Sequence, residues 1–177
     1  TDKQFIYEQF ENMLTDSVKI RMRSDVPYGA FLSGGLDSSS IVALMSEISS
    51  YPVNTFTIGF DDSSFDESKL AQEVADKFKT KHFLGTVEPE SFEEMLAKVV
   101  FHYDEPFGDS SAIPTGYVSK FAAQEVKMVL TGDGGDEVLS GYRSYVGQKF
   151  VEKYNRVPSF VRKKLPGLVK ASLPLYK

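Results

Sequence analysis

The sequence predicts an α/β fold in which a mainly parallel sheet lies between two layers of helices. Short apolar runs rich in β-branched and aromatic residues have the composition of buried parallel strands. The predicted strands cover 28–32, 53–60, 81–87 and 126–130. Amphipathic runs alternate with them, as in chains built from strand-helix-strand units. Two strands also run directly into glycine-rich polar turns, at 33–39 and 131–137, where such folds place their ligands.

The predicted helices are recognised by apolar residues at three- and four-residue spacing. The first lies within residues 1–24, and Pro27 separates it from the first strand. Its apolar face, which we expect to pack on the domain, consists of Phe5, Ile6, Phe10, Met13, Leu14, Ser17 and Val18. Further helices are expected over 37–49, after an N-cap at Asp66, over 90–103 and over about 113–124.

The bulk composition limits the class of protein. At 177 residues and 41% hydrophobic content, the chain is long enough for one domain with its own core and too short for two. The absence of cysteine excludes disulfides, thiolate metal sites and a cysteine nucleophile, and it fits a reducing compartment. No apolar run approaches the roughly 20 residues of a membrane-spanning helix, and no signal peptide is visible. We therefore expect a cytoplasmic protein, or an excised piece of one, with no membrane partner.

The charge is unevenly distributed along a chain whose net charge is −5. Residues 152–177 hold seven of the 20 lysine and arginine residues and one of the 25 acidic residues. A basic tail occurs in nucleic-acid-binding proteins, but it is more often the solvated face of short helices, so nucleic acid is not the expected partner. We assign residues 1–150 to the core and residues 151–177 to the incomplete start of a C-terminal helical part.

The turn Ser33-Gly34-Gly35-Leu36-Asp37-Ser38-Ser39 has the features of a phosphate-binding loop. Its glycines let backbone N–H groups approach an anion, its serines add hydroxyl donors, and the following helix presents its N-terminus. The spacing matches neither G-x-x-x-x-G-K-[ST] nor G-x-G-x-x-G. The alternative is a turn that joins a strand to a helix and binds nothing.

The second turn, Thr131 to Glu137, contributes carboxylates and three glycines. In a parallel sheet both turns lie at the same edge and can converge on one crevice. Carboxylates beside a polyphosphate repel it unless a cation lies between them, and hard oxygen ligands favour Mg²⁺. The predicted metal ligands are Asp37 and Asp136, one from each turn. A Ca²⁺ loop is the alternative, but the spacing does not match the EF-hand pattern.

The first loop resembles the S-G-G-x-D-S motif of ATP pyrophosphatases, which cut ATP into AMP and pyrophosphate. Segments 31–39, 57–60, 103–111 and 131–137, followed by Gly141-Tyr142, occur in the order and spacing of the synthetase domain of glutamine-hydrolysing asparagine synthetases. The resemblance extends over about residues 16–143. It implies a three-layer fold like that of the adenine nucleotide alpha hydrolases.

The resemblance also implies a set of ligand-binding residues. ATP would lie with its adenine near Leu32 and Ile58 and with its sugar and α-phosphate near Thr131 and Gly132. Pyrophosphate would lie in the first loop, whose binding residues are Ser33, Gly34, Gly35, Asp37, Ser38 and Ser39. Mg²⁺ would lie between Asp37, Asp136 and the phosphates. ATP and Mg²⁺ are therefore the expected cofactors.

The reaction that the resemblance implies is an amide synthesis. The side-chain carboxylate of aspartate attacks the α-phosphorus to give β-aspartyl-AMP, and ammonia then displaces AMP to form asparagine. The catalytic residues would be Asp133 and Asp136, and the acyl substrate would lie near Asp109, Ser110 and Ser111, although a helix-capping turn is the alternative for that segment. Ammonia would come from glutamine through a glutaminase domain that this chain lacks. A homodimer is compatible with the family resemblance, so a second copy of the chain is one of the partners considered.

The sequence departs from the family pattern in several places. Asp133 stands where the family often has Glu, and Val138-Leu139-Ser140 stands where it more usually has Leu-Phe-Gly. A lysine that stabilises the phosphorus transition state in the family lies C-terminal to this segment. We therefore expect a fragment that binds nucleotide weakly and makes little or no asparagine. Alternatives are a β-lactam or peptide-cyclising amide synthetase, a tRNA-modifying ATP pyrophosphatase, and an interaction domain that retains only the fold.

Overall fold

The computed structural model describes residues 2–60, 66–86, 92–105, 108–156 and 158. The chain divides into two compact units, Thr1–Asp133 and Gly134–Lys177, and each is described by itself below. Three predicted segments are described only in part: the strand 81–87, the helix 90–103 and the C-terminal part 151–177. Their remaining residues lie outside the described ranges.

The first unit contains a four-stranded sheet. Its strands are β1 (Tyr28–Phe31), β2 (Asn54–Gly59), β3 (Lys81–Thr86) and β4 (Met128–Leu130). Their spatial order is β3-β2-β1-β4, and every pair is parallel, which confirms the predicted sheet. The last strand begins two residues later than predicted, because the Val126 N–H still donates to Ala122 O of the preceding helix.

The register brings the two predicted turns to one edge of the sheet. Ala30 in β1 lies between Thr55 of β2 and Leu130 of β4. Since all three strands run in the same direction, the chain leaves β1 and β4 at neighbouring points. Parallel sheets bind ligands beyond the carboxyl ends of their strands, so this edge is the place to look for a site.

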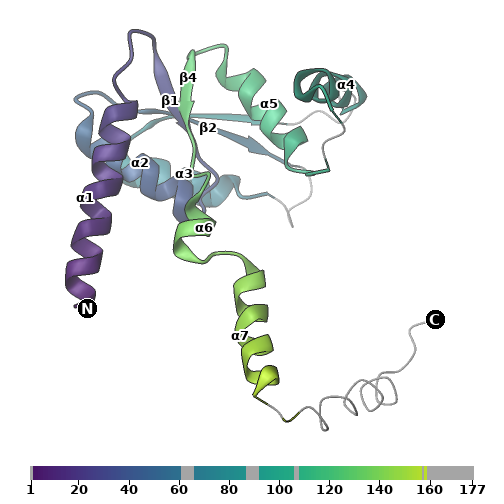
Figure 1. Cartoon of the computed structure of the whole chain (residues 1–177). Helices are drawn as coiled ribbons and strands as arrows, with labels where there is room; N and C mark the ends of the chain where they lie inside the picture. The colour runs from purple at the N-terminus through teal and green to yellow at the C-terminus, as the bar shows by residue number, and fades with distance from the viewer. Residues whose placement is uncertain (1, 61–65, 87–91, 106–107, 157, 159–177) are drawn as a thin grey trace. The chain divides into compact units, whose positions relative to one another are not determined.

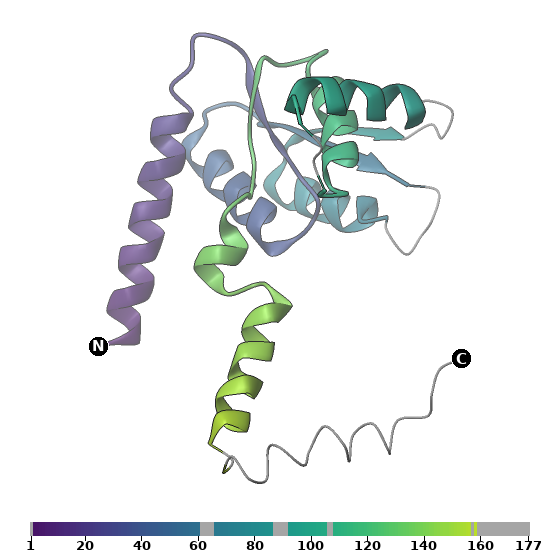
Figure 2. The ribbon, with the colours of Figure 1, turned by 45° about the vertical axis from the view of Figure 1, so that its right-hand side comes forward.

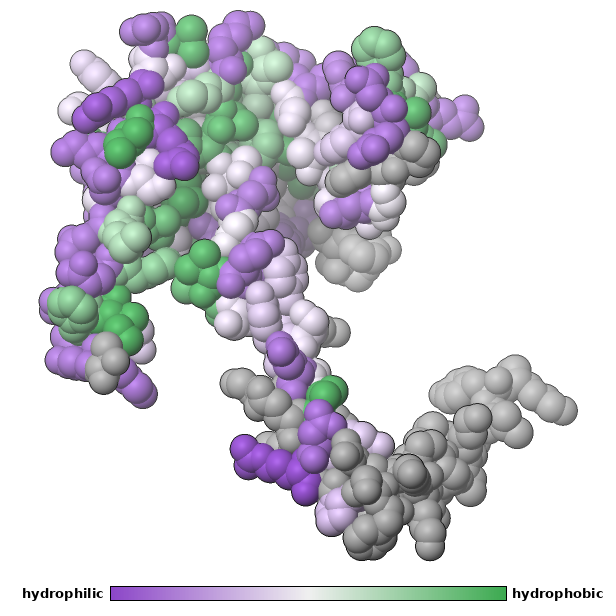
Figure 3. Space-filling model, viewed as in Figure 1, coloured by the Kyte–Doolittle hydropathy of each residue, from purple (hydrophilic) through white to green (hydrophobic). Residues whose placement is uncertain are grey.

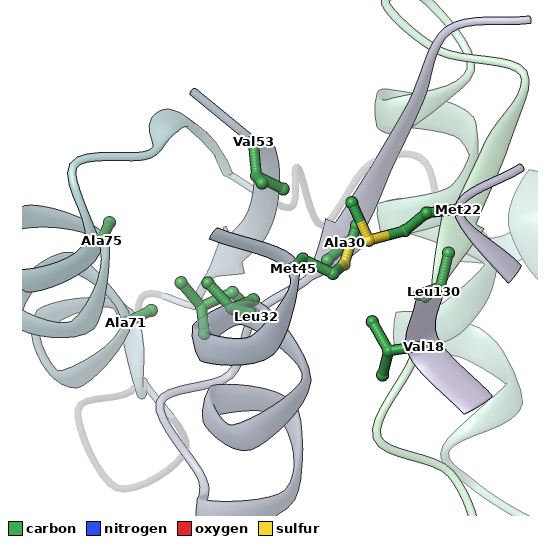
Figure 4. Close-up of a cluster of buried hydrophobic side chains, with 10 residues drawn as sticks. Val18, Met22, Ala30, Leu32, Met45, Val53, Ala71, Ala75 and Leu130 are labelled. Carbon is green, nitrogen blue, oxygen red and sulfur yellow. The ribbon is translucent and has the colours of Figure 1, made fainter. Parts of the chain in front are cut away.

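Three helices cover one face of the sheet: α1 (Lys3–Arg21), α2 (Leu36–Ile48) and α3 (Ser68–Phe78). Side chains from these helices and from the strands form one buried cluster. Figure 4 shows Val18 and Met22 of the N-terminal segment, Met45 of α2 and Ala71 and Ala75 of α3 together with Ala30, Leu32, Val53 and Leu130 from the sheet side.

Two further helices, α4 (Phe92–Tyr103) and α5 (Ala112–Ala122), lie on the opposite side, and α5 packs directly on the sheet. The centre of this layer is aromatic. The Phe56 ring stacks on Phe83 with 5.1 Å between centroids and meets Phe121 edge-on at 6.1 Å. Figures 1 and 2 show α5 and the pair α2 and α3 on opposite faces, which confirms the predicted three-layer α/β/α arrangement.

The packing of α1 differs from the prediction. Along this helix, all of which the structure describes, Val18 is the one buried residue. Phe5, Phe10 and Met13 are 56%, 37% and 71% exposed, and Figure 3 shows hydrophobic side chains at the surface of this part of the helix. The reason is length, because a 19-residue helix is about 28 Å long and only its last turns reach the cluster beneath the sheet.

The N-terminus of α3 corrects a smaller prediction. The helix has Glu67 as its N-cap, and Glu67 makes no side-chain capping bond. The Asp66 carboxylate instead accepts hydrogen bonds from Ser68 N and Ser68 Oγ, at 3.1 and 2.9 Å. These bonds lower the pKa of Asp66. The helix therefore begins one residue later than predicted, and Asp66 caps it from the position before the N-cap.

The second unit begins with α6 (Gly135–Leu139), which is followed by α7 (Arg143–Asn155). Gly134 and Ser140 flank α6 in left-handed conformations, with φ of 89° and 60°. The predicted strand-turn-helix junction after β4 is thus present. In the residues that the structure describes, no helix is long and apolar enough to cross a membrane.

Candidate functional site

The loop after β1 is anchored to the neighbouring strand before it turns. Leu32 N donates to Phe56 O at 2.9 Å, and the buried Thr57 hydroxyl donates to Leu32 O. The Leu32 side chain is 2% exposed and belongs to the core cluster on the α2 face. Hydrogen bonding to β2 therefore continues to Leu32, and this fixes the position at which the loop begins.

Two serines give the loop its internal shape. Ser38 Oγ accepts a hydrogen bond from Ser33 N at 3.2 Å, and the two hydroxyl oxygens lie 3.0 Å apart. Ser33 Oγ in turn accepts from Gly35 N at 3.2 Å. Ser38 is 8% exposed. The sequence predicted both serines as phosphate donors, and the structure shows that their hydroxyl groups also bond to each other and to the loop backbone.

Glycine is required at position 34 for two reasons. Its φ of 78° lies in the left-handed region, which side chains disfavour. A Cβ at this position would also lie 2.6 Å from Leu70 Cβ and 2.8 Å from Ala71 N. The loop therefore packs directly against the first turns of α3, and this contact fixes the path of its backbone.

The first turn of α2 presents unpaired backbone donors at the end of this loop. The helix has Gly35 as its N-cap and no side-chain capping bond. Ser39 N donates to Gly35 O at 3.0 Å, so the N–H groups of residues 36–38 precede the first helical bond. A helix N-terminus of this kind attracts anions through its N–H groups and its dipole. Asp37, half-buried in the same turn, adds a carboxylate.

The second predicted turn reaches the first one at Gly132. A Cβ on this glycine would lie 2.7 Å from Ser38 N and 3.0 Å from Asp37 Cβ. Such distances leave no room for any side chain, so the backbone after β4 passes directly over the first turn of α2. The convergence predicted from the sequence is therefore present for residues 131–133, which belong to the first unit.

A cavity of about 410 Å³ lies between α1 and the end of β4, and it is lined by Thr131 and Asp133 but by no residue of the loop 33–39. Thr131 and Asp133 line it from the β4 side, and the Thr131 hydroxyl donates to Asp133 Oδ2 at 2.8 Å. On the α1 side, Arg21 donates through Nη1 to Ser17 O and Ser17 Oγ, at 3.1 and 2.6 Å. Arg21 was not among the predicted site residues, because its position depends on how α1 packs beside β4.

One hydroxyl group in the first turn of α2 has no partner. Ser39 Oγ is buried and makes no hydrogen bond among the described residues, and the same is true of Ser46 Oγ further along the helix. A buried hydroxyl without a partner costs free energy unless something else bonds to it. The Ser39 hydroxyl and the N–H groups of residues 36–38 lie at the same end of α2, next to the glycine-containing loop. They are hydrogen-bond donors of the kind that a phosphate requires.

The predicted adenine contacts lie on different faces of the sheet. Ile58 is half-buried at the end of β2 and packs in the aromatic cluster under α5. Leu32 follows the adjacent strand but packs in the cluster on the α2 face. Any contact of Leu32 with a ligand would therefore come from its backbone, and the assignment of adenine to this pair stays a prediction.

The predicted acyl-binding residues form a capping turn before α5. Ser111 N donates to Asp109 Oδ1 at 2.9 Å, and Ala112 N donates to Asp109 O at 3.2 Å. The bond from Ser111 holds the pKa of Asp109 below its usual value. Asp109, Ser110 and Ser111 are all exposed. The structure thus shows the helix-capping role of this segment, and its substrate-binding role stays a prediction.

Two carboxylates of the second turn, those of Asp136 and Glu137, belong to the second unit. Asp136 is half-buried in the first turn of α6, and Glu137 accepts a hydrogen bond from the Tyr142 hydroxyl at 2.7 Å. The described residues contain no cluster of three or more His, Cys, Asp or Glu side chains arranged to hold a metal. Mg²⁺ at nucleotide sites usually takes one or two carboxylates together with phosphate oxygens and water, so Asp37 and Asp136 fit that mode as individual ligands.

Comparison with known proteins supports one family. A putative glutamine-hydrolysing asparagine synthetase 2 from Methanocaldococcus jannaschii is 44% identical over 177 residues, which are 99% of this chain and 33% of that protein. Glutamine-hydrolysing asparagine synthetase 1 from Bacillus subtilis is 37% identical over 93% of this chain and 26% of its own length. Amidase chyE from Penicillium rubens is 31% identical over 79% of this chain and 23% of its own length.

The chain thus spans about a third of the length of the Methanocaldococcus relative and about a quarter of the Bacillus one. The family model described as asparagine synthase matches residues 9–176. This match includes both turns and every strand of the sheet. The chain therefore belongs to the asparagine synthase family.

Proposed function

We propose that this chain is the ATP-binding part of a ligase that makes asparagine from aspartate, ATP and ammonia. The observation that carries the proposal is the contact of Gly132 with the first turn of α2, which joins the two turns of the family pattern at one anion-attracting helix end. The names of the Methanocaldococcus and Bacillus relatives support asparagine as the product.

The first loop is proposed to hold the two phosphates that leave as pyrophosphate. Because Gly34 fixes the backbone against α3 and the Ser33 and Ser38 hydroxyl groups brace it, the donors of residues 36–39 need no rearrangement to face an anion. A rigid donor set stabilises developing negative charge better than a mobile one. Release of pyrophosphate requires that stabilisation, since the bond that breaks joins the α-phosphorus to the bridging oxygen.

Asp37 and Asp136 are proposed to hold Mg²⁺, which when bound neutralises phosphate charge and polarises the phosphoryl oxygens. Asp37 suits this role because it lies within the first turn of α2, next to the phosphate donors. Its carboxylate would repel the phosphates if no cation lay between them. That Asp136 supplies the second ligand rests on the family pattern of the 131–137 turn.

The chemistry takes place in two steps. The aspartate side-chain carboxylate attacks the α-phosphorus, and pyrophosphate leaves to give β-aspartyl-AMP. Ammonia then attacks the acyl carbon, AMP leaves, and the nitrogen loses a proton. Asp133, held by the Thr131 hydroxyl at the wall of the cavity, is proposed to assist the second step as the proton acceptor. Asp109, Ser110 and Ser111 are the proposed contacts for the acyl substrate.

The test is calorimetric titration of ATP into the 177-residue chain, with Mg²⁺ and again with EDTA. We expect binding that requires Mg²⁺ and that is lost in Asp37→Ala and in Asp136→Ala. Asp25→Ala, at an exposed position before β1, is the matched control and should bind as the wild type does. Absence of binding in both conditions, or equal binding with EDTA, would contradict the proposed site.

The match to an amidase favours a second candidate, a related synthetase that forms an amide on another acid. Both candidates share the ATP site and differ in the acyl substrate. If aspartate is the substrate, it should tighten the binding of ATP and Mg²⁺ while glutamate has little effect, because two ligands that meet in one site change each other's affinity equally. No effect of aspartate would favour the second candidate.

A further inference from the structure

The chain turns sharply after α6 and returns to the start of that helix. Ser140 adopts a left-handed conformation, and Gly141 N donates to Asp136 O at 3.0 Å. Gly141 therefore lies beside Asp136. All of these residues belong to the unit Gly134–Lys177, so the arrangement is a local property of one turn.

The Asp136 side chain occupies space that exists because residue 141 has no side chain. A Cβ at this position would lie 2.8 Å from Asp136 Cγ and in direct collision with Asp136 Oδ1. It would also approach Asp136 Cα to 3.2 Å. The φ of Gly141 is not in the left-handed region, so its conformation alone does not call for glycine. A side chain at this position would therefore displace the Asp136 carboxylate from the place it occupies here.

The neighbouring carboxylate is held in a different direction. Glu137 accepts the hydrogen bond of the Tyr142 hydroxyl group, which lowers the pKa of Glu137 and raises the pKa of Tyr142 to about 12. The side chains of Asp136 and Glu137 thus contact different residues of the chain that returns after α6. Glu137 is directed to Tyr142, and Asp136 lies over Gly141.

We propose that Gly141 is a positioning residue that fixes the Asp136 carboxylate in the orientation in which it binds the divalent cation of the nucleotide site. This inference rests on the proposed function, since it assigns a partner to a carboxylate whose metal role is itself proposed. It adds that the absence of a side chain at position 141 is required for cation binding. Residues that orient metal ligands typically contribute 10–100-fold to affinity.

The test is the Gly141→Ala variant of the 177-residue chain, with titration of ATP in the presence of Mg²⁺ and of EDTA. The added methyl group forces Asp136 into another rotamer, so we expect Mg²⁺-dependent ATP binding to weaken about 10- to 100-fold. Gly147→Ala is the matched control, because a Cβ there meets nothing within 4 Å and lies in the same unit. This control should bind ATP as the wild type does.

A double-mutant cycle separates the inference from the proposed function. Because ATP binding is expected to be lost in Asp136→Ala, the cycle is read from the unfolding midpoint. Gly141→Ala should lower the midpoint in the wild-type background and leave it unchanged in the Asp136→Ala background, where no carboxylate meets the added methyl group. If Asp136→Ala weakens binding but Gly141→Ala leaves it unchanged, the inference is overturned and the proposed function stands. If ATP binding by the wild type does not depend on Mg²⁺, or if Asp136→Ala keeps the Mg²⁺-dependent binding of the wild type, the metal assignment fails and the inference fails with it.

Discussion

Gly132 lies so close to the first turn of α2 that a Cβ on it would come within 2.7 Å of Ser38 N. The contact joins the segment after β4 to the segment after β1, and it is made by backbone atoms on both sides. Backbone atoms cannot move aside as a flexible side chain can. The separation of the two turns is therefore fixed by the sheet register and by one glycine.

The first prediction concerns Gly132→Ala. The methyl group must push residues 131–133 away from α2, and overpacking of this kind costs about 1–3 kcal/mol. We expect a lower free energy of unfolding in urea. We also expect weaker ATP binding, since residues 131–133 would move away from the N–H groups in the first turn of α2. Gly108→Ala, where a Cβ meets nothing within 4 Å, should change neither quantity. Unchanged stability in Gly132→Ala would contradict the close packing.

The second prediction uses two buried hydroxyl groups of α2, Ser39 and Ser46, that have no hydrogen-bond partner in the part of the chain that the structure describes. Replacing either by alanine removes no hydrogen bond that the described residues make, so the free energy of unfolding should stay the same or rise slightly. Only Ser39 lies in the first turn of the helix. We expect Ser39→Ala to weaken ATP binding about tenfold, the typical effect of losing a hydrogen bond to a charged group, while Ser46→Ala binds normally. Equal affinities of the two variants would remove Ser39 from the site.

The sequence was sufficient for the parts of the fold that depend on local pattern. Apolar runs of strand composition and alternating amphipathic runs predicted a parallel sheet between helices, and all four strands are present. The glycine-rich turns predicted where the strands end and, because parallel strands share an edge, that the turns approach each other. Residues Ser33 to Ser39 could be proposed as a phosphate loop for the same reason, since such a loop is contiguous in the chain, and this assignment stays a prediction.

Contacts between distant segments were beyond the sequence pattern. The apolar spacing of α1 predicts a helix but does not say how far the helix extends past the sheet, so the exposure of Phe5 and Met13 was missed. Arg21 was missed for the same reason. The role of Gly132 could not be predicted either. The turn contains three glycines, and the sequence does not indicate which of them packs against the backbone of another segment.

The third prediction concerns Ser140, which stands in a left-handed conformation with φ of 60°. Residues other than glycine lose roughly 1 kcal/mol or more in this region, and glycine is favoured after a helix C-terminus. Ser140→Gly should therefore stabilise the end of α6. The readout is hydrogen exchange of the Gly141 amide, which donates to Asp136 O and should exchange about fivefold more slowly.

Ser144→Gly is the matched control for this substitution. Ser144 lies in α7, where glycine has a lower helix propensity than serine. The same change of residue should therefore give no gain in protection there. Faster exchange of the Gly141 amide in Ser140→Gly would show that the serine side chain supports the turn in a way that its conformation does not reveal.

The fourth prediction concerns the pH dependence of stability through His82. Its Nδ1 lies 2.9 Å from Thr55 Oγ1, which is itself 2.8 Å from Thr80 Oγ1. Its Nε2 is buried and has no hydrogen-bond partner among the residues that the structure describes. Burial lowers the pKa of His82 below 6.5, and the negative charge of Asp76 opposes this only in part. The folded state therefore binds the proton less readily than the unfolded state does.

Because the folded pKa is the lower one, the neutral ring contributes its full stability above about pH 6.5. That contribution declines as the pH falls from this value through the folded pKa, where the unfolded state takes up the proton first. Urea unfolding measured between pH 8 and pH 5 should show a loss of stability in the wild type that is smaller in His82→Gln, which has no titrating ring. The carboxyl groups with lowered pKa values, such as Asp66 and Asp109, act only at more acidic pH and do not obscure this window. Parallel pH profiles of the two proteins would mean that His82 titrates equally in the folded and unfolded states.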